Sequence, residues 1–271
     1  MDVVAYALLL VFMAFLLFPL YFMVVTMLKP EAEITSLIAP LGVRSPTLDN
    51  IRALFTDTPF LRWSLNSTIV AVSTTVISTS IAILAAYALV RYKFRGAQTI
   101  SMAIFITYLV PSTLLFIPMT VVVRELGLFD NIFGLIVVYP TMAAPLATWL
   151  LTGFFRTIPR ELEAAARIDG ASYWQAFYMV TLPLARSGII STGIFTFTVS
   201  WNEYLYALAL LPSSSSQTLP VGVPNAFAFG DAFFWGPLMT AAVLGSVPIV
   251  LVYSLSMKAF VSGMTAGAVK G

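Results

Sequence analysis

The sequence contains no cysteine and no histidine. Their absence excludes disulfide frameworks, thiol catalysis, Cys/His metal sites and imidazole acid–base chemistry. Charged residues make up only 10% of the 271 residues, whereas an ordinary soluble domain carries about a quarter. The pattern G-x-x-x-x-G-K-[ST] is also absent, so the chain cannot bind and hydrolyse ATP through a P-loop of its own. Any use of ATP must come from another subunit.

What is present is apolar: 59% of the residues are hydrophobic and the mean hydropathy is +0.94. A membrane-spanning helix needs about 20 mostly apolar residues. The sequence therefore predicts an all-α polytopic membrane protein with six transmembrane helices, forming a single domain over residues 1–271. The first run lacks a basic n-region and an A-x-A cleavage site, so we expect a retained span. The expected spans are Val3–Leu28, Asn66–Val90, Thr99–Val123, Ile132–Phe154, Ser187–Leu211 and Leu238–Val261.

Basic residues predict the orientation of the spans. Nine of the fourteen Lys and Arg residues lie at or near the loops and ends on one side: three in residues 91–95, four in 155–186, and Lys258 and Lys270. Both termini and the 155–186 segment are therefore expected in the cytoplasm. The polar segments at about 30–63 and 212–236 are expected outside, the first with a short helix around Thr47–Phe55.

Arg160–Leu184 is the longest polar interruption between the spans. Pro159 suits the first turn of a helix, where Glu161 and Glu163 would favour the helix dipole. Gly170 permits a sharp turn, and Ser172 can cap a second short helix, Tyr173–Val180, which Pro183 would terminate. The segment is expected to lie against the membrane rather than cross it. Composition alone would also fit a solvated amphipathic loop between two spans.

The order of residues in this segment resembles the EAA loop of binding-protein-dependent ABC importer permeases. The family pattern is Glu-Ala-Ala, three residues, Gly, nine residues and Ile-x-Leu-Pro. Here it reads Ala164-Ala165-Ala166, Gly170 after three residues, and Val180-Thr181-Leu182-Pro183 after nine more. The family's glutamate position is occupied by Ala164, with Glu161 and Glu163 nearby.

Further stretches resemble the carbohydrate-uptake, MalG-like branch of these permeases, in the expected order along nearly the whole chain. They are Phe18-Pro19, Leu28-Lys29-Pro30, Asn66-Ser67-Thr68, Ala86–Arg91, Trp201-Asn202-Glu203-Tyr204, Thr218–Gly222 and Gly263–Gly271.

The resemblance implies a non-catalytic permease in a prokaryotic plasma (inner) membrane. It implies a heterodimer with a second, MalF-like permease, two cytoplasmic ATPase subunits that bind ATP and Mg²⁺, and an extracytoplasmic sugar-binding protein. This chain would hold no cofactor and bind no nucleic acid, and its other partner would be membrane lipid. The 212–236 loop would help release sugar from the binding protein, and the Ser262–Gly271 tail would enter the ATPase interface.

Two groups of residues are the candidate sites. The resemblance assigns ATPase coupling to the 155–186 segment, through Glu161, Glu163, Ala164, Ala165, Asp169, Gly170, Ala171, Trp174, Leu182 and Pro183. Asp169 could instead pair with Arg167. A charge inside a span is costly, so Glu203 should face the bundle interior or an aqueous path. With Trp201, Asn202 and Tyr204 it is a candidate for the translocation pathway; the alternatives are a hydrogen bond between helices and ordinary aromatic packing.

A rival hypothesis from another class is a self-sufficient secondary transporter or channel that uses Glu203 as its proton or ion site. The lone intramembrane acid, the absence of histidine and the EAA-type loop weigh against it.

Overall fold

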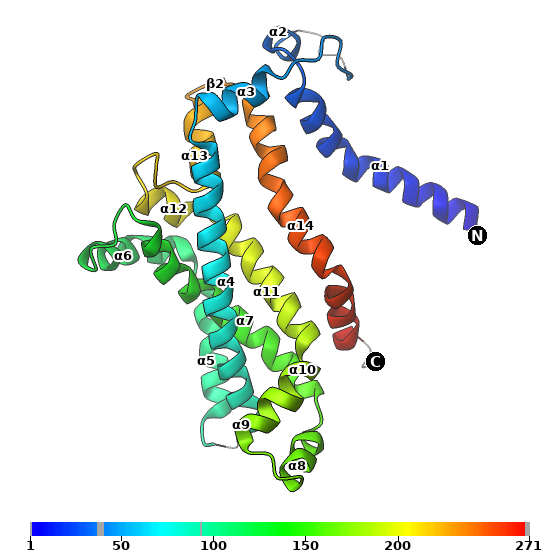
Figure 1. Cartoon of the computed structure of the whole chain (residues 1–271), viewed down its shortest axis with the longest axis vertical. Coiled ribbons are helices and arrows are strands. Elements are labelled where there is room, and N and C mark those ends of the chain that lie inside the picture. The colour runs from blue at the N-terminus through cyan, green and yellow to red at the C-terminus, as the bar shows by residue number, and fades with distance from the viewer. Residues whose placement is uncertain (1, 37–40, 93, 269–271) are drawn as a thin grey trace. The chain divides into compact units, whose positions relative to one another are not determined.

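The computed structural model describes residues 2–36, 41–92 and 94–268, and these are mostly helical (Figure 1). They form two compact units. Unit 1 comprises residues 1–65 and 217–250, and unit 2 comprises residues 66–216 and 251–271. Helices α4 (Phe60–Arg91) and α14 (Trp235–Ala268) contribute residues to both units.

Within the described residues, four helices are long and apolar enough to cross a membrane, and two bent helix pairs bring the possible number to six. This agrees with the predicted all-α, six-span protein. The four helices are α1 (Asp2–Met27), α4, α7 (Ile132–Thr157) and α14, and the pairs are α5 (Ala97–Leu109) with α6 (Ser112–Glu125), and Tyr173–Leu184 with α11 (Arg186–Trp201).

The third predicted span, Thr99–Val123, is not one continuous helix. Helix α5 ends at Leu109 and α6 begins at Ser112, at an angle of 92°. Val110 takes an extended conformation, with ψ of 122°, because the ring of Pro111 disfavours the helical region for the residue before it. Pro140 and Pro145, by contrast, lie inside the continuous helix α7.

The fifth predicted span, Ser187–Leu211, is also broken. Helix α11 ends at Trp201, and α12 (Leu205–Leu210) begins after three non-helical residues. The last span extends further than predicted, because α14 continues through Ala268 into the expected small-residue tail. Residues 269–271 of that tail lie outside the described residues.

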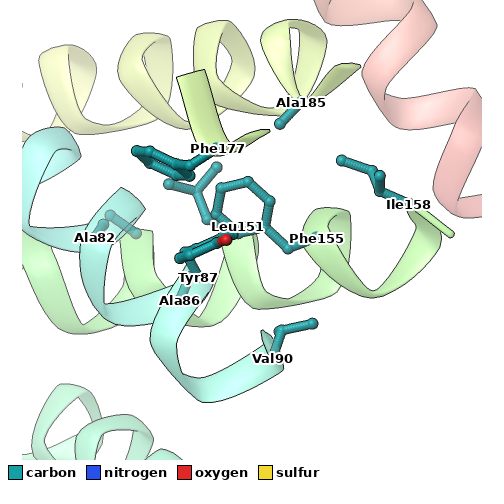
Figure 2. Close-up of a cluster of buried hydrophobic side chains, with 10 residues drawn as sticks. Ala82, Ala86, Tyr87, Val90, Leu151, Phe155, Ile158, Phe177 and Ala185 are labelled. Carbon is teal, nitrogen blue, oxygen red and sulfur yellow. The ribbon is translucent and has the colours of Figure 1, made fainter. Parts of the chain in front are cut away.

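A hydrophobic core in unit 2 joins the ends of α4 and α7 to the segment that follows α7. Helix α7 packs against α5 and α11. Where α4 and α7 end, ten buried side chains meet, among them Tyr87, Leu151, Phe155 and Phe177 (Figure 2). The ring of Tyr87 lies 4.5 Å from that of Phe177. The ends of α4 and α7 and the polar segment after α7 therefore share one hydrophobic core.

Unit 1 contains the short elements that connect its longer helices: α2 (Glu31–Ile34), α3 (Asp49–Thr56), α13 (Leu219–Phe227), β1 (Ala228–Phe229) and β2 (Ala232–Phe233). Helix α3 confirms the predicted short helix around Thr47–Phe55. The Asn50 amide donates to the carbonyls of Met27 at 3.0 Å and Lys29 at 2.7 Å, which fixes α3 to the end of α1. Gly222 packs against the buried Trp63: a Cβ there would lie 2.4 Å from its ring.

Candidate functional site

The candidate coupling segment, residues 155–186, begins with helix α8 (Arg160–Ile168). Pro159 precedes it, and Glu161 and Glu163 lie in its first turn as predicted. Gly170 has a φ of +95°, in the left-handed region that glycine adopts at little cost. The predicted helix–glycine–helix arrangement is thus present. Asp169 is exposed, and Arg167 lies over the ring of Tyr173 at 3.7 Å rather than against Asp169.

The second helix begins as predicted but ends later. Ser172 and Gln175 form a capping box, in which each side chain accepts from the other's backbone N–H. Helix α9 (Tyr173–Ala176) then continues as the π-helix η1 (Phe177–Thr181) and α10 (Leu182–Leu184). Pro183 does not terminate the helical path, contrary to the prediction. It stands in the first turn of α10, where proline's missing N–H costs little.

Glu163 lies at the centre of a buried polar network that sequence reasoning did not find. Its carboxylate accepts from Arg91 Nε at 2.7 Å and from the Tyr87 hydroxyl at 3.2 Å, and the Thr181 hydroxyl also donates to it. Arg91 Nη1 donates to the carbonyl of Ile158 at 3.2 Å. The Arg91 and Glu163 side chains are only 6% and 13% exposed. The Arg91–Glu163 ion pair joins α4 to α8, and the hydrogen bonds around it reach the end of α7 at Ile158 and η1 at Thr181.

Arg160 reinforces the link at the start of α8, because its guanidinium donates to the carbonyl of Val90 near the end of α4. The only sequence signal for these contacts was a basic residue at the end of one span and a carboxylate in a later loop. Glu163 thus points inward, while Glu161, Ala164, Ala165 and Asp169 are exposed. Three more of the predicted coupling residues, Gly170, Trp174 and Pro183, are also exposed. The other two, Ala171 and Leu182, are partly buried.

The segment also carries large apolar side chains on its surface. Ile168 is 87% exposed, and Trp174 stacks on the exposed Tyr178 with 6.1 Å between the ring centroids. The full set is Leu162, Ile168, Tyr173, Trp174, Tyr178, Met179 and Leu184. Clustered exposed apolar residues mark surfaces that bind a partner or a membrane.

A cavity of about 410 Å³ lies where α8 and α9 approach the end of α4. It is lined by Tyr87, Arg91, Tyr92, Arg160, Glu163, Ala164, Arg167, Tyr173 and Ala176. A second cavity, of about 710 Å³, shares Tyr92 and Arg160 with the first and extends to the start of α5.

The candidate pathway residues of 201–204 lie at the break between α11 and α12. Glu203 accepts from the Tyr139 hydroxyl at 2.6 Å and from the backbone N–H groups of Tyr206 and Ala207 at 2.9 and 3.2 Å. Trp201 is buried and stacks on Phe197, while Asn202 and Tyr204 are exposed. Glu203 therefore supplies acceptors for the unsatisfied N–H groups at the start of α12.

These features, a polytopic helical chain with an EAA-type segment packed on the ends of its spans, define a membrane transport subunit. The chain belongs to the family described as "Binding-protein-dependent transport system inner membrane component", whose model matches residues 78–266. The predicted recognition as a permease of this family is confirmed.

Several relatives align along almost the whole chain. The inner membrane ABC transporter permease protein YcjP of Escherichia coli (strain K12) is 37% identical over 262 residues, which cover 96% of this chain and 93% of the relative. The trehalose transport system permease protein SugB of Mycobacterium tuberculosis is 36% identical, over 90% of this chain and 89% of the relative. The solved structure of a bacterial ABC transporter that imports alginate matches with a TM-score of 0.82 at 23% identity, covering 96% of each chain, which shows a shared fold.

Proposed function

We propose that this chain is the permease subunit of an ATP-driven carbohydrate importer, and that the 155–186 segment couples it to an ATPase. The observation that carries the proposal is the buried Arg91–Glu163 pair, 2.7 Å between Nε and Oε1. It fixes the segment to the spans on one side, while apolar side chains such as Ile168 and Trp174 remain exposed. A segment that is bound firmly to two spans can transmit the movement of a docked partner to both of them.

Membership of the family suggests the other subunits of the transporter complex. A second, MalF-like permease would complete the pathway, two ATPase subunits would bind ATP and Mg²⁺, and an extracytoplasmic binding protein would deliver the substrate. Carbohydrate is the substrate class because relatives are named for the transport of trehalose, diacetylchitobiose and maltodextrin. The chain itself would be non-catalytic.

Docking can be tested with two matched charge substitutions. Ile168→Glu places a carboxylate in the exposed apolar surface of the segment, and Leu126→Glu makes the same change at an exposed residue after α6. We expect Ile168→Glu to abolish co-purification of the ATPase subunits in mild detergent, and Leu126→Glu to leave it unchanged. Retention of the ATPase by Ile168→Glu would refute the docking role.

The orientation can be tested because the chain has no cysteine. Phe94 and Ser215 are both exposed and lie in loops expected on opposite sides of the membrane. In intact cells an impermeant thiol reagent should label Ser215→Cys and not Phe94→Cys. Labelling of Phe94→Cys alone would reverse the proposed orientation.

A further inference from the structure

The 410 Å³ cavity beneath α8 carries excess positive charge. Three arginines line it, Arg91, Arg160 and Arg167, against one carboxylate, Glu163, which is already paired with Arg91. Arg91 Nη2 is buried and has no hydrogen-bond partner in the described structure. Burying a guanidinium nitrogen without an acceptor costs free energy, and a bound anion near this site would lower that cost.

The cavity lacks the acid that the family pattern would place in it. Ala164, which stands at the family's glutamate position, is one of the lining residues. A glutamate there would add a second negative charge among the three arginines. With alanine, the cavity keeps both its positive charge and its space.

The position of the cavity along α4 corresponds to the headgroup layer of a membrane. Helix α4 has 32 residues, a length of about 48 Å at 1.5 Å per residue. A bilayer including its headgroups is about 40–45 Å thick, so Arg91, at the end of α4, lies at the membrane surface. Tyr92 and Tyr173 also line the cavity, and aromatic residues of this kind gather at the interface.

The adjoining 710 Å³ cavity supplies an apolar wall beside the charged groups. Leu89, Val90 and Ala97 line it together with Arg95, and it shares Arg160 with the first cavity. An amphiphile could place its anionic group among the arginines and its glycerol and acyl carbons against these side chains.

We propose that the two cavities together bind an anionic phospholipid, with its phosphate held by Arg160 and Arg167 beside the buried Arg91 guanidinium. Basic pockets between membrane helices are typical sites for anionic headgroups. Lipid is favoured over a carboxylate from a protein partner because the cavity lies at the headgroup layer and adjoins the apolar side chains of Leu89, Val90 and Ala97. The proposal does not depend on ATPase docking. Bound lipid would tie the coupling segment to the membrane surface at the end of α4.

The test compares lipid retention by purified full-length protein, measured by native mass spectrometry after addition of phosphatidylglycerol or phosphatidylcholine with the same acyl chains. The variant Arg160→Gln/Arg167→Gln removes two pocket charges and leaves the buried Arg91–Glu163 pair intact. The control, Arg156→Gln/Arg186→Gln, removes two exposed arginines of the same segment that line neither cavity. We expect wild type and control to retain phosphatidylglycerol preferentially, and the pocket variant to bind it about tenfold or more weakly.

Ala164→Glu provides a second variant that removes no arginine. Its carboxylate should reduce phosphatidylglycerol retention. The docking variant Ile168→Glu, at a residue that lines neither cavity, should retain the lipid, which separates this proposal from the proposed function. Equal retention of both lipids, or unchanged retention in the pocket variant, would overturn the proposal. So would full displacement of the lipid by inorganic phosphate, which would make free phosphate the ligand. Unchanged lipid retention with loss of the ATPase would assign the arginines to a partner's carboxylate instead.

Discussion

Two glutamates of unit 2, Glu163 and Glu203, each accept a hydrogen bond from a tyrosine hydroxyl, yet they are stabilised differently. Glu163 pairs with Arg91, 72 residues away in the sequence, and also accepts from Thr181. Glu203 accepts from the backbone N–H groups three and four residues ahead of it. In the described part of the chain its donors are all neutral.

These contacts indicate that Glu163 connects several helices, whereas Glu203 mainly stabilises its own part of the chain. A carboxylate that binds side chains from several elements holds those elements together, and its loss leaves a buried cation behind. A carboxylate at the start of α12 shapes one helix break, and the partial positive charge of the helix N-terminus favours it there. Because their surroundings differ, the two glutamates are expected to respond differently to substitution.

The largest effect is expected from Glu163→Ala. Removing one partner of a buried pair strands the other, so Arg91 would be left charged and uncompensated, at a cost of about 3–5 kcal/mol. Thermal unfolding of the purified protein in detergent measures this loss. Glu161→Ala, in the same turn but exposed, is the control and should change stability by about 0.5 kcal/mol or less. Equal shifts for the two variants would show that the Arg91–Glu163 pair contributes nothing.

Glu203→Gln should cost less and spare function. The amide keeps the shape and one acceptor oxygen but loses a charge-assisted bond, about 1.5–3 kcal/mol. An ATP-driven permease needs no titrating group at this position, so the variant should retain much of its uptake, still dependent on ATP and on the binding protein. Glu125→Gln, at an exposed position of α6, is the control.

The rival transporter hypothesis makes the opposite prediction for Glu203→Gln. Under it, reconstituted wild-type chain alone would move sugar in response to an imposed pH gradient, and Glu203→Gln would abolish that movement. Such a result would contradict the proposed importer.

Local signals explain what the sequence could predict. The start of α8, the turn at Gly170 and the cap at Ser172 each depend on residues within one or two turns, and all three are present. The break at Pro111 was not predicted, because Pro140 and Pro145 show that a proline in an apolar run also fits a continuous helix. Pro140 is buried in α7, where packing with neighbouring helices compensates for the lost hydrogen bond.

The Arg91–Glu163 pair lay beyond sequence reasoning for a different reason. Its residues are 72 positions apart and belong to segments with no shared periodicity. Only the packing of α4, α7 and η1 around Tyr87 and Phe177 brings the charges together. For Glu203 the sequence shows a charge near a span, but not its donors, the Tyr139 hydroxyl and the backbone N–H groups of Tyr206 and Ala207.

Gly170→Ala tests the turn that joins α8 to α9. At a φ of +95° an added Cβ is strained, by about 1–2 kcal/mol, although nothing lies within 4 Å of it. Gly153→Ala is the matched control, since it also has open space but lies inside α7. There alanine should stabilise the protein by about 0.5–1 kcal/mol. Opposite signs in thermal unfolding are expected. Equal effects of the two substitutions would show that the left-handed backbone conformation of Gly170 is not the deciding factor.

The bulkier Gly170→Val extends this test to coupling. In the assembled complex it should lower substrate-stimulated ATPase activity while the protein stays in the membrane. Undiminished activity would count against the coupling role of the segment.

The smallest effects are expected from the two tyrosines, and they compare the glutamates most directly. Tyr139→Phe removes a 2.6 Å bond to Glu203, whose other donors are two backbone N–H groups. Tyr87→Phe removes a 3.2 Å bond to Glu163, which keeps Arg91 and Thr181. A short bond to a carboxylate without a cation is worth more than a long bond to one that is already neutralised. We therefore expect a loss of about 1–1.5 kcal/mol for Tyr139→Phe and about 0.5 kcal/mol for Tyr87→Phe in thermal unfolding. If Tyr87→Phe were the more damaging substitution, the guanidinium would not be the main support of Glu163, and the contrast between the two carboxylates would fail.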